Sequence, residues 1–121
     1  PVLNMAVHKA SLDIFEEAGG MPALRERSLR LTAYLEKTVR AIASTTGANL
    51  EIITPSNPVE RGCQLSIVAH GQGRDLHDKL SEAGVVVDCR EPDVIRMAPV
   101  PLYNSFEDIA RFGHILTESL S

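Results

Sequence analysis

The sequence predicts an α+β domain in which helices cover one face of a largely antiparallel sheet. Three observations lead to this fold class. Two long segments before residue 48 carry apolar residues at helical spacing, and four short segments after it have the alternation or β-branched composition of strands. Glycines and prolines separate these segments. The expected order of elements is ααββαββα, which is typical of a small α+β sandwich.

The first 47 residues are expected to form a helical linker and a long helix. Asn4 is suited to cap a first helix that runs to about Ala18 and has a broad apolar face. Pro22 suits the first turn of the second helix, which ends near Gly47. Its inward stripe steps by three and four residues along Leu24, Ser28, Leu31, Leu35, Thr38 and Ile42.

Residues 48–121 are expected to form the α+β sandwich itself. A short strand at 50–54 precedes a loop at 55–62 that contains two prolines and a glycine. From Cys63 to His70 the residues alternate as in a half-buried strand. The inward positions of that strand are Cys63, Leu65, Ile67 and Ala69.

Gly71-Gln-Gly73 is interpreted as a turn and not as a nucleotide-binding motif, because Leu76 stands where a third glycine is required. A helix then covers about 74–83 and ends at Gly84. A β-branched strand at 85–89 and a turn at 90–93 lead into a strand that contains Arg96.

The last helix is expected to run from about Phe106 to Leu120. Ser105 is its predicted cap, and Asp108 is placed to complete a capping box. Gly113 inside this helix costs about 1 kcal/mol relative to alanine, which suggests close packing at that point. The inward stripe is Ile109, Phe112, Leu116 and Leu120.

Length and composition exclude several classes. The 121 residues fit one domain, and a net charge of −4 without a Lys/Arg cluster argues against a nucleic-acid partner. No apolar run approaches the roughly 20 residues that span a bilayer, and no secretion signal is visible, so no membrane partner and a cytoplasmic location are expected. The segment Pro1–Leu3 reads as the tail of a connection, so we expect a piece of a longer protein.

The usual catalytic and metal-binding patterns are not found. The four histidines have no metal-ligand spacing, and no metal is expected. The two cysteines fall on inward strand positions and are expected to be buried and inert. None of the three lysines lies in a catalytic setting. These residues are His8, His70, His77 and His114, Cys63 and Cys89, and Lys9, Lys37 and Lys79.

Arg96 is the one polar residue that the pattern singles out. It lies in an otherwise apolar strand, and a buried guanidinium requires an anionic partner. Two roles stay open on physical grounds: an ion pair or exposed arginine, and a ligand for a substrate carboxylate, which the planar fork fits with two hydrogen bonds. A structural role pairs Arg96 with an internal carboxylate, whereas a substrate role leaves it without one. The acids nearest in sequence, Glu91 and Asp93, belong to the preceding turn.

Five segments together resemble kynureninase, over essentially the whole chain but only the C-terminal part of that enzyme. The segment Ile95–Phe106, Ile-Arg-Met-Ala-Pro-Val-Pro-Leu-Tyr-Asn-Ser-Phe, is the longest and most specific. The others are 10–15, 31–36, 52–56 and 60–67.

The resemblance implies the small C-terminal domain of the aminotransferase-like fold, in an enzyme that uses pyridoxal phosphate to hydrolyse L-kynurenine to anthranilate and alanine. It implies that Arg96 binds the substrate carboxylate and that the enzyme is a homodimer. The catalytic and cofactor-binding residues are expected in a large domain upstream, so these 121 residues alone are expected to be inactive.

Two other interpretations stay open. The chain could be the small domain of a cysteine desulfurase or an aminotransferase, although Cys63, placed within a strand, is poorly positioned for a desulfurase. It could also be a non-catalytic ligand-binding α+β module. A large domain with a cofactor lysine upstream would exclude the last.

Overall fold

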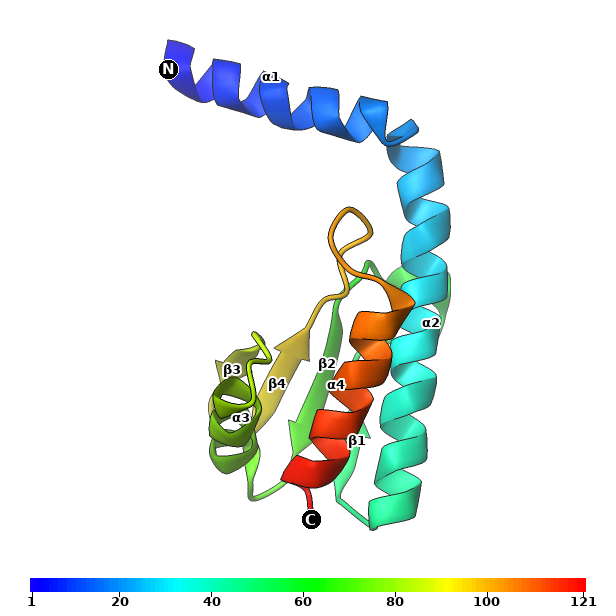
Figure 1. Cartoon of the computed structure of the whole chain (residues 1–121), viewed down its shortest axis with the longest axis vertical. Helices are drawn as coiled ribbons and strands as arrows, with labels where there is room; N and C mark the ends of the chain where they lie inside the picture. The colour runs from blue at the N-terminus through cyan, green and yellow to red at the C-terminus, as the bar shows by residue number, and fades with distance from the viewer.

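The computed structural model describes all 121 residues and has the predicted order ααββαββα (Figure 1). Four α-helices and four strands are present, with a short 3-10 turn, η1, at Pro58–Glu60. The helices are α1 (Val2–Glu17), α2 (Gly20–Thr46), α3 (Gly73–Glu82) and α4 (Phe106–Ser119). The strands are β1 (Leu50–Ile52), β2 (Leu65–Ala69), β3 (Asp88–Arg90) and β4 (Val94–Met97).

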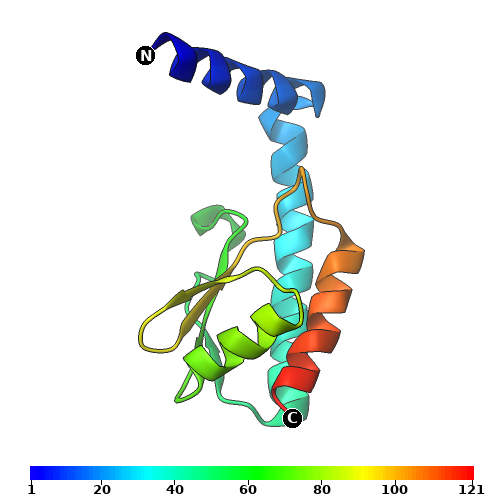
Figure 2. The ribbon, with the colours of Figure 1, turned by 60° about the vertical axis from the view of Figure 1, so that its left-hand side comes forward.

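The strands form one sheet in the order β1-β2-β4-β3, and every neighbouring pair is antiparallel. The register places Ser66 of β2 and Asp88 of β3 on either side of Arg96 in β4. Long α2 and α4 and short α3 lie on one side of this sheet, and no helix lies on the other (Figures 1 and 2). The predicted α+β class with helices on one face is confirmed.

The core lies between that helical layer and the sheet. Leu65, Ile67 and Ala69 of β2 are fully buried, as their alternation predicted. Ile95 and Met97 of β4 are also buried and point to the same face of the sheet as these β2 residues. The helices complete the core with Leu31, Leu35, Val39, Leu76, Leu80, Ile109, Phe112 and Leu116.

Helix α2 begins two residues before the predicted Pro22 and ends, as predicted, where Gly47 adopts a left-handed conformation with φ of 70°. Its buried face differs in part from the predicted stripe. Thr32 and Val39 are buried, whereas Thr38 and Ile42 are only half-buried. The difference arises because Thr38 and Ile42 face α4 at Gly113 and not the centre of the core.

Helix α1 starts earlier than predicted. The amide of Met5 donates to the carbonyl of Pro1 at 3.0 Å, so Pro1 precedes the helix and Asn4 lies within its first turn instead of capping it. No residue of α1 is buried, and the helix projects away from the rest of the chain (Figures 1 and 2). None of the helices combines the length and the apolar composition that a membrane span requires.

Two strand predictions were wrong in their limits. The segment 85–87 is not a strand, because the amide of Val85 still bonds to Leu80 of α3 and Val86 is 98% exposed. Strand β3 therefore begins at Asp88. Cys63 lies in a bend before β2, because pairing of β2 with β1 and β4 extends no further than Leu65.

Helix α4 begins with the predicted capping box. Ser105 Oγ accepts from the amide of Asp108 at 3.1 Å, and Asp108 Oδ2 accepts from the amide of Ser105 at 2.9 Å. The close packing expected at Gly113 is also confirmed, since a Cβ there would lie 2.8 Å from Cγ2 of Thr38. The two helices therefore approach closely at this glycine.

Candidate functional site

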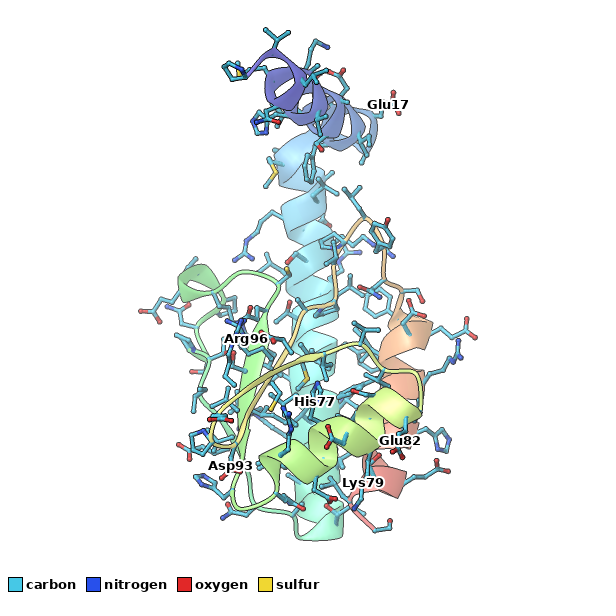
Figure 3. The ribbon with its side chains drawn as sticks, turned by 90° about the vertical axis from the view of Figure 1, so that its left-hand side faces the viewer. Glu17, His77, Lys79, Glu82, Asp93 and Arg96 are labelled. Atoms are coloured by element: carbon cyan, nitrogen blue, oxygen red, sulfur yellow. The ribbon has the colours of Figure 1, made fainter.

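The sheet has an open face, which we define by Ser66, Val68, Asp88, Arg90, Val94 and Arg96. These residues alternate with the buried strand residues, so they point away from the helices. Figure 3 shows Arg96 on the strand side of the molecule, whereas His77, Lys79 and Glu82 belong to α3 on the helical side. Polar and charged side chains gather around Arg96 on this face.

Arg96 pairs with Asp88 across the β3–β4 register. Nε donates to Oδ2 of Asp88 at 2.9 Å, and Nη2 donates to the same oxygen. The two side chains are 34% and 45% exposed, so the pair is reached by water. Both hydrogen bonds come from the Nε–Nη2 edge of the guanidinium, and neither uses Nη1.

This pairing differs from what a substrate role was expected to show, which was an arginine without a carboxylate partner. The sequence pointed to Glu91 and Asp93 as the nearest acids and not to Asp88. Asp88 lies eight residues before Arg96 and becomes its neighbour only when the β3–β4 hairpin forms. A hairpin centred on residue 92 pairs Asp88 with Arg96, and testing that register on the sequence would have found this partner.

Arg90 adds a second positive charge to this cluster. Its Nη2 lies 3.1 Å from Oδ2 of Asp88, so two guanidinium groups share one carboxylate oxygen. The hydrogen bond from Arg96, assisted by the charge of Arg90, lowers the pKa of Asp88 below its ordinary value. The three side chains together keep a formal charge of +1, which suits an anionic ligand.

On the other side of Arg96, polar groups continue along the open face. Ser66, its neighbour in β2, is buried, and its Oγ accepts from Nε2 of Gln64 at 3.1 Å. The amide of Ser66 donates to Oγ1 of Thr54 at 2.8 Å. The end of β1 and the start of β2 thus bring hydroxyl and amide groups to the edge of the arginine site.

The loop after β4 is held by an arginine that the sequence did not point to. Arg27 of α2 donates from Nε to the carbonyl of Pro101 at 3.0 Å and from Nη2 to the carbonyl of Asn104 at 3.1 Å. Oδ1 of Asn104 accepts from the amide of Val100 at 2.8 Å. The loop that follows Arg96 is therefore fixed by these contacts as well as by its prolines.

The histidines do not converge on a site. His70 pairs with Glu51 at 2.8 Å and His77 with Asp78 at 3.2 Å, while His8 and His114 are exposed. No group of three or more histidine, cysteine or acidic side chains is placed to hold a metal ion.

The two cysteines are free and lie apart from one another in the fold. Cys63 and Cys89 are only half-buried, whereas the sequence predicted that both would be buried. Cys63 precedes β2, and Cys89 lies on edge strand β3, where only one neighbouring strand covers it.

A cleft of about 340 Å³ lies on the helical side, apart from Arg96. It is bounded by the segment 83–87, the end of β4 and the first turns of α4. Most of its lining is apolar, with Asn104, Asp108 and Arg111 as polar members. The arginine cluster and this cleft are separate features of the chain.

The family model for the kynureninase C-terminal domain matches residues 24–116. The chain belongs to the kynureninase C-terminal domain family. The matched range begins within α2 and includes the whole sheet, with Arg96, Asp88 and the loop that follows β4.

Curated relatives agree with this family. A protein named kynureninase from Flavobacterium psychrophilum is 48% identical over 120 residues, and one from Flavobacterium johnsoniae is 49% identical over 120 residues; each match covers 99% of this chain. A kynureninase from Xanthomonas oryzae pv. oryzae is 54% identical over 115 residues, or 93% of this chain. The chain spans 28% of the two Flavobacterium proteins and 26% of the Xanthomonas protein.

Proposed function

We propose that this chain acts as the C-terminal small domain of a kynureninase. That enzyme hydrolyses L-kynurenine, and its 3-hydroxy form, to anthranilate or 3-hydroxyanthranilate and L-alanine with pyridoxal phosphate. The observation that carries the proposal is the family match over residues 24–116. In this proposal residues 1–47 link the domain to the large domain, and residues 48–121 form the sandwich beside the active site.

Arg96 is the residue that we assign to the substrate, as the ligand of the α-carboxylate. Support comes from the edge of the guanidinium that Asp88 does not use. A carboxylate can accept two parallel hydrogen bonds from Nη1 and Nη2 while Nε and the other Nη2 hydrogen stay on Asp88. The open face leaves this edge free of helical cover, and the formal charge of +1 favours an anion.

The competing role for Arg96 is a structural cross-strand pair with Asp88. A pair at this exposure, beside a second arginine, is weakly stabilising because water screens it. A structural role therefore predicts little consequence for catalysis, whereas the substrate role predicts a large one. This difference makes the two roles separable.

The residues of this chain do not fit a covalent pyridoxal phosphate site. Lys9 and Lys79 are exposed on α1 and α3 and pair with Asp13 at 2.8 Å and Asp75 at 2.9 Å. Lys37 is exposed on α2. We therefore assign the cofactor lysine and the catalytic residues to the large domain, and the 121 residues alone are inactive in this proposal.

The partners in this proposal are the large domain and a second subunit. Helix α1 supports them, because its Val2, Leu3, Met5, Val7 and Ile14 are all more than half exposed. Apolar side chains that the rest of the chain leaves exposed are stabilised when another surface covers them. A homodimer with kynurenine as its small-molecule substrate follows from the same assignment.

The test is Arg96→Lys in the full-length enzyme, numbered as in this chain. Lysine keeps the charge but loses the planar fork. Losing a charge-assisted hydrogen bond costs about 1.5–3 kcal/mol, so kcat/KM for kynurenine is expected to fall about ten- to a hundredfold. Arg74→Lys, at an exposed position of α3, is the matched control. Normal kinetics in Arg96→Lys would contradict the assignment.

A further inference from the structure

Asp88 binds one defined edge of the Arg96 guanidinium. Neutralising the charge alone would not require a particular edge. Asp88 takes the side edge of the guanidinium, formed by Nε and Nη2, with a single oxygen. The end edge, formed by Nη1 and Nη2, is the one that can bind a second carboxylate in the same plane. Fixing the side edge therefore sets the direction of the end edge.

The position of Asp88 makes it suited to this task. It lies directly opposite Arg96 in the register of two paired strands, so the backbone fixes the separation of the two side chains. Arg90 contacts the same Oδ2 at 3.1 Å and so adds a second contact that restrains the carboxylate. An arginine side chain loses considerable rotamer freedom when it is oriented, and this arrangement orients it before any ligand arrives.

We propose that Asp88 is a positioning residue, which holds the side edge of Arg96 so that its end edge is presented to the α-carboxylate of the substrate. This inference rests on the proposed function, because it assigns to Asp88 the orientation of the group that binds the substrate. Asp88 itself makes no contact with the substrate in this arrangement and takes no part in the chemistry. Its removal weakens the carboxylate contact without removing the arginine.

The test compares Asp88→Asn, Asp88→Ala, Arg96→Lys and the double variant Asp88→Ala/Arg96→Lys in the full-length enzyme. Asparagine keeps the shape and one acceptor oxygen, so it is expected to preserve part of the function. We expect KM for kynurenine to rise about threefold in Asp88→Asn and about tenfold in Asp88→Ala, with kcat within about twofold of the parent. Asp75→Asn, which removes the exposed partner of Lys79 on the helical side, is the matched control.

Two readouts separate positioning from general support of the fold. The first is inhibition by a kynurenine analogue whose α-carboxylate is replaced by hydrogen. Its inhibition constant is expected to stay unchanged in both Asp88 variants, whereas a damaged fold would weaken this analogue and kynurenine alike. The second is the double variant, which is expected to be no worse than Arg96→Lys, because Asp88 acts only through the fork.

The results of these variants distinguish a failure of the positioning role of Asp88 from a failure of the carboxylate-binding role of Arg96. If Arg96→Lys has normal kinetics, the proposed function of Arg96 fails, and the role of Asp88 fails with it. If Arg96→Lys is impaired but Asp88→Asn and Asp88→Ala retain the parent KM, only the positioning role is overturned. The positioning role is also overturned if the Asp88 variants bind the analogue and kynurenine more weakly by the same factor. It is overturned as well if the losses of the two single variants multiply in the double variant.

Discussion

Asp93 and Gly73 contact each other through both side chain and backbone. Oδ1 of Asp93 accepts from the amide of Gly73 at 3.0 Å, and Oδ2 accepts from the amide of Gly71 at 2.9 Å. A Cβ on Gly73 would lie 2.3 Å from Cα of Asp93, so only glycine fits there. The first turn of α3 is thereby fastened to the residue that precedes β4.

The hydrogen bonds from Gly71 and Gly73 lower the pKa of Asp93 below its ordinary value. A lowered folded-state pKa means that the carboxylate stabilises the fold above its unfolded pKa of about 4, and that this contribution is lost as the pH falls through the folded value. We expect Asp93→Asn to lower the free energy of unfolding at pH 7 and to flatten its decline in acid, as urea titrations at several pH values would measure. Asp13→Asn on α1 is the control, and an unchanged acid slope in Asp93→Asn would contradict the linkage.

Gly113 permits the close approach of α4 to Thr38 of α2. In Gly113→Ala the new Cβ meets Cγ2 of Thr38, a stiff β-branched side chain. Overpacking costs about 1–3 kcal/mol against a helix-propensity gain of about 1 kcal/mol, so we expect a net loss of up to about 2 kcal/mol in the free energy of unfolding.

Thr38→Ser is the companion variant, because it removes the obstructing methyl and keeps the hydroxyl that donates to the carbonyl of Tyr34. In that background Gly113→Ala should stabilise the domain by about 0.5–1 kcal/mol. The same loss in both backgrounds, measured by chemical denaturation, would show that Thr38 is not the obstacle.

Helix α1 exposes its apolar side chains, so we expect the 121-residue chain to self-associate. Val7 and Leu12 are exposed and Phe15 is half-buried, so the rest of the chain covers this helix only in part. Sedimentation should show a mass that rises with concentration, and Val7→Gln with Leu12→Gln should shift the equilibrium toward monomer. His8→Gln on the same helix is the control. A strict monomer at high concentration would refute this expectation.

The 121-residue chain is expected not to take up pyridoxal phosphate covalently at one site. Its lysines are exposed on helices, and two of them pair with acidic side chains one turn away. Borohydride reduction followed by mass spectrometry should find no stoichiometric adduct on Lys9, Lys37 or Lys79, and the full-length enzyme is the positive control. One specifically and fully modified lysine would overturn the assignment of the cofactor to the large domain.

Local chemistry made much of the fold predictable. The stripe of α2, the alternation of β2 and the Ser105–Asp108 capping box each depend on residues a few positions apart, and the structure confirms their main features. The close approach at Gly113 was also predictable, since a glycine within a helix is tolerated where a neighbour needs the space. Helix limits shifted by one to three residues, as at α1 and α2, where no side-chain cap hydrogen bond fixes the first turn.

Only the tertiary structure determined the surroundings of Arg96. The sequence predicted a turn at 90–93 and an inward position for Cys89, but it did not set the register between the two strands that this turn joins. The observed turn has three residues, Glu91–Asp93, and pairs Arg90 with Val94, so Asp88 faces Arg96. A shift of one residue moves every side chain of a strand to the other face. Alternation along a single strand reveals which residues share a face, but the partner across the sheet depends on a register that forms only when the hairpin closes.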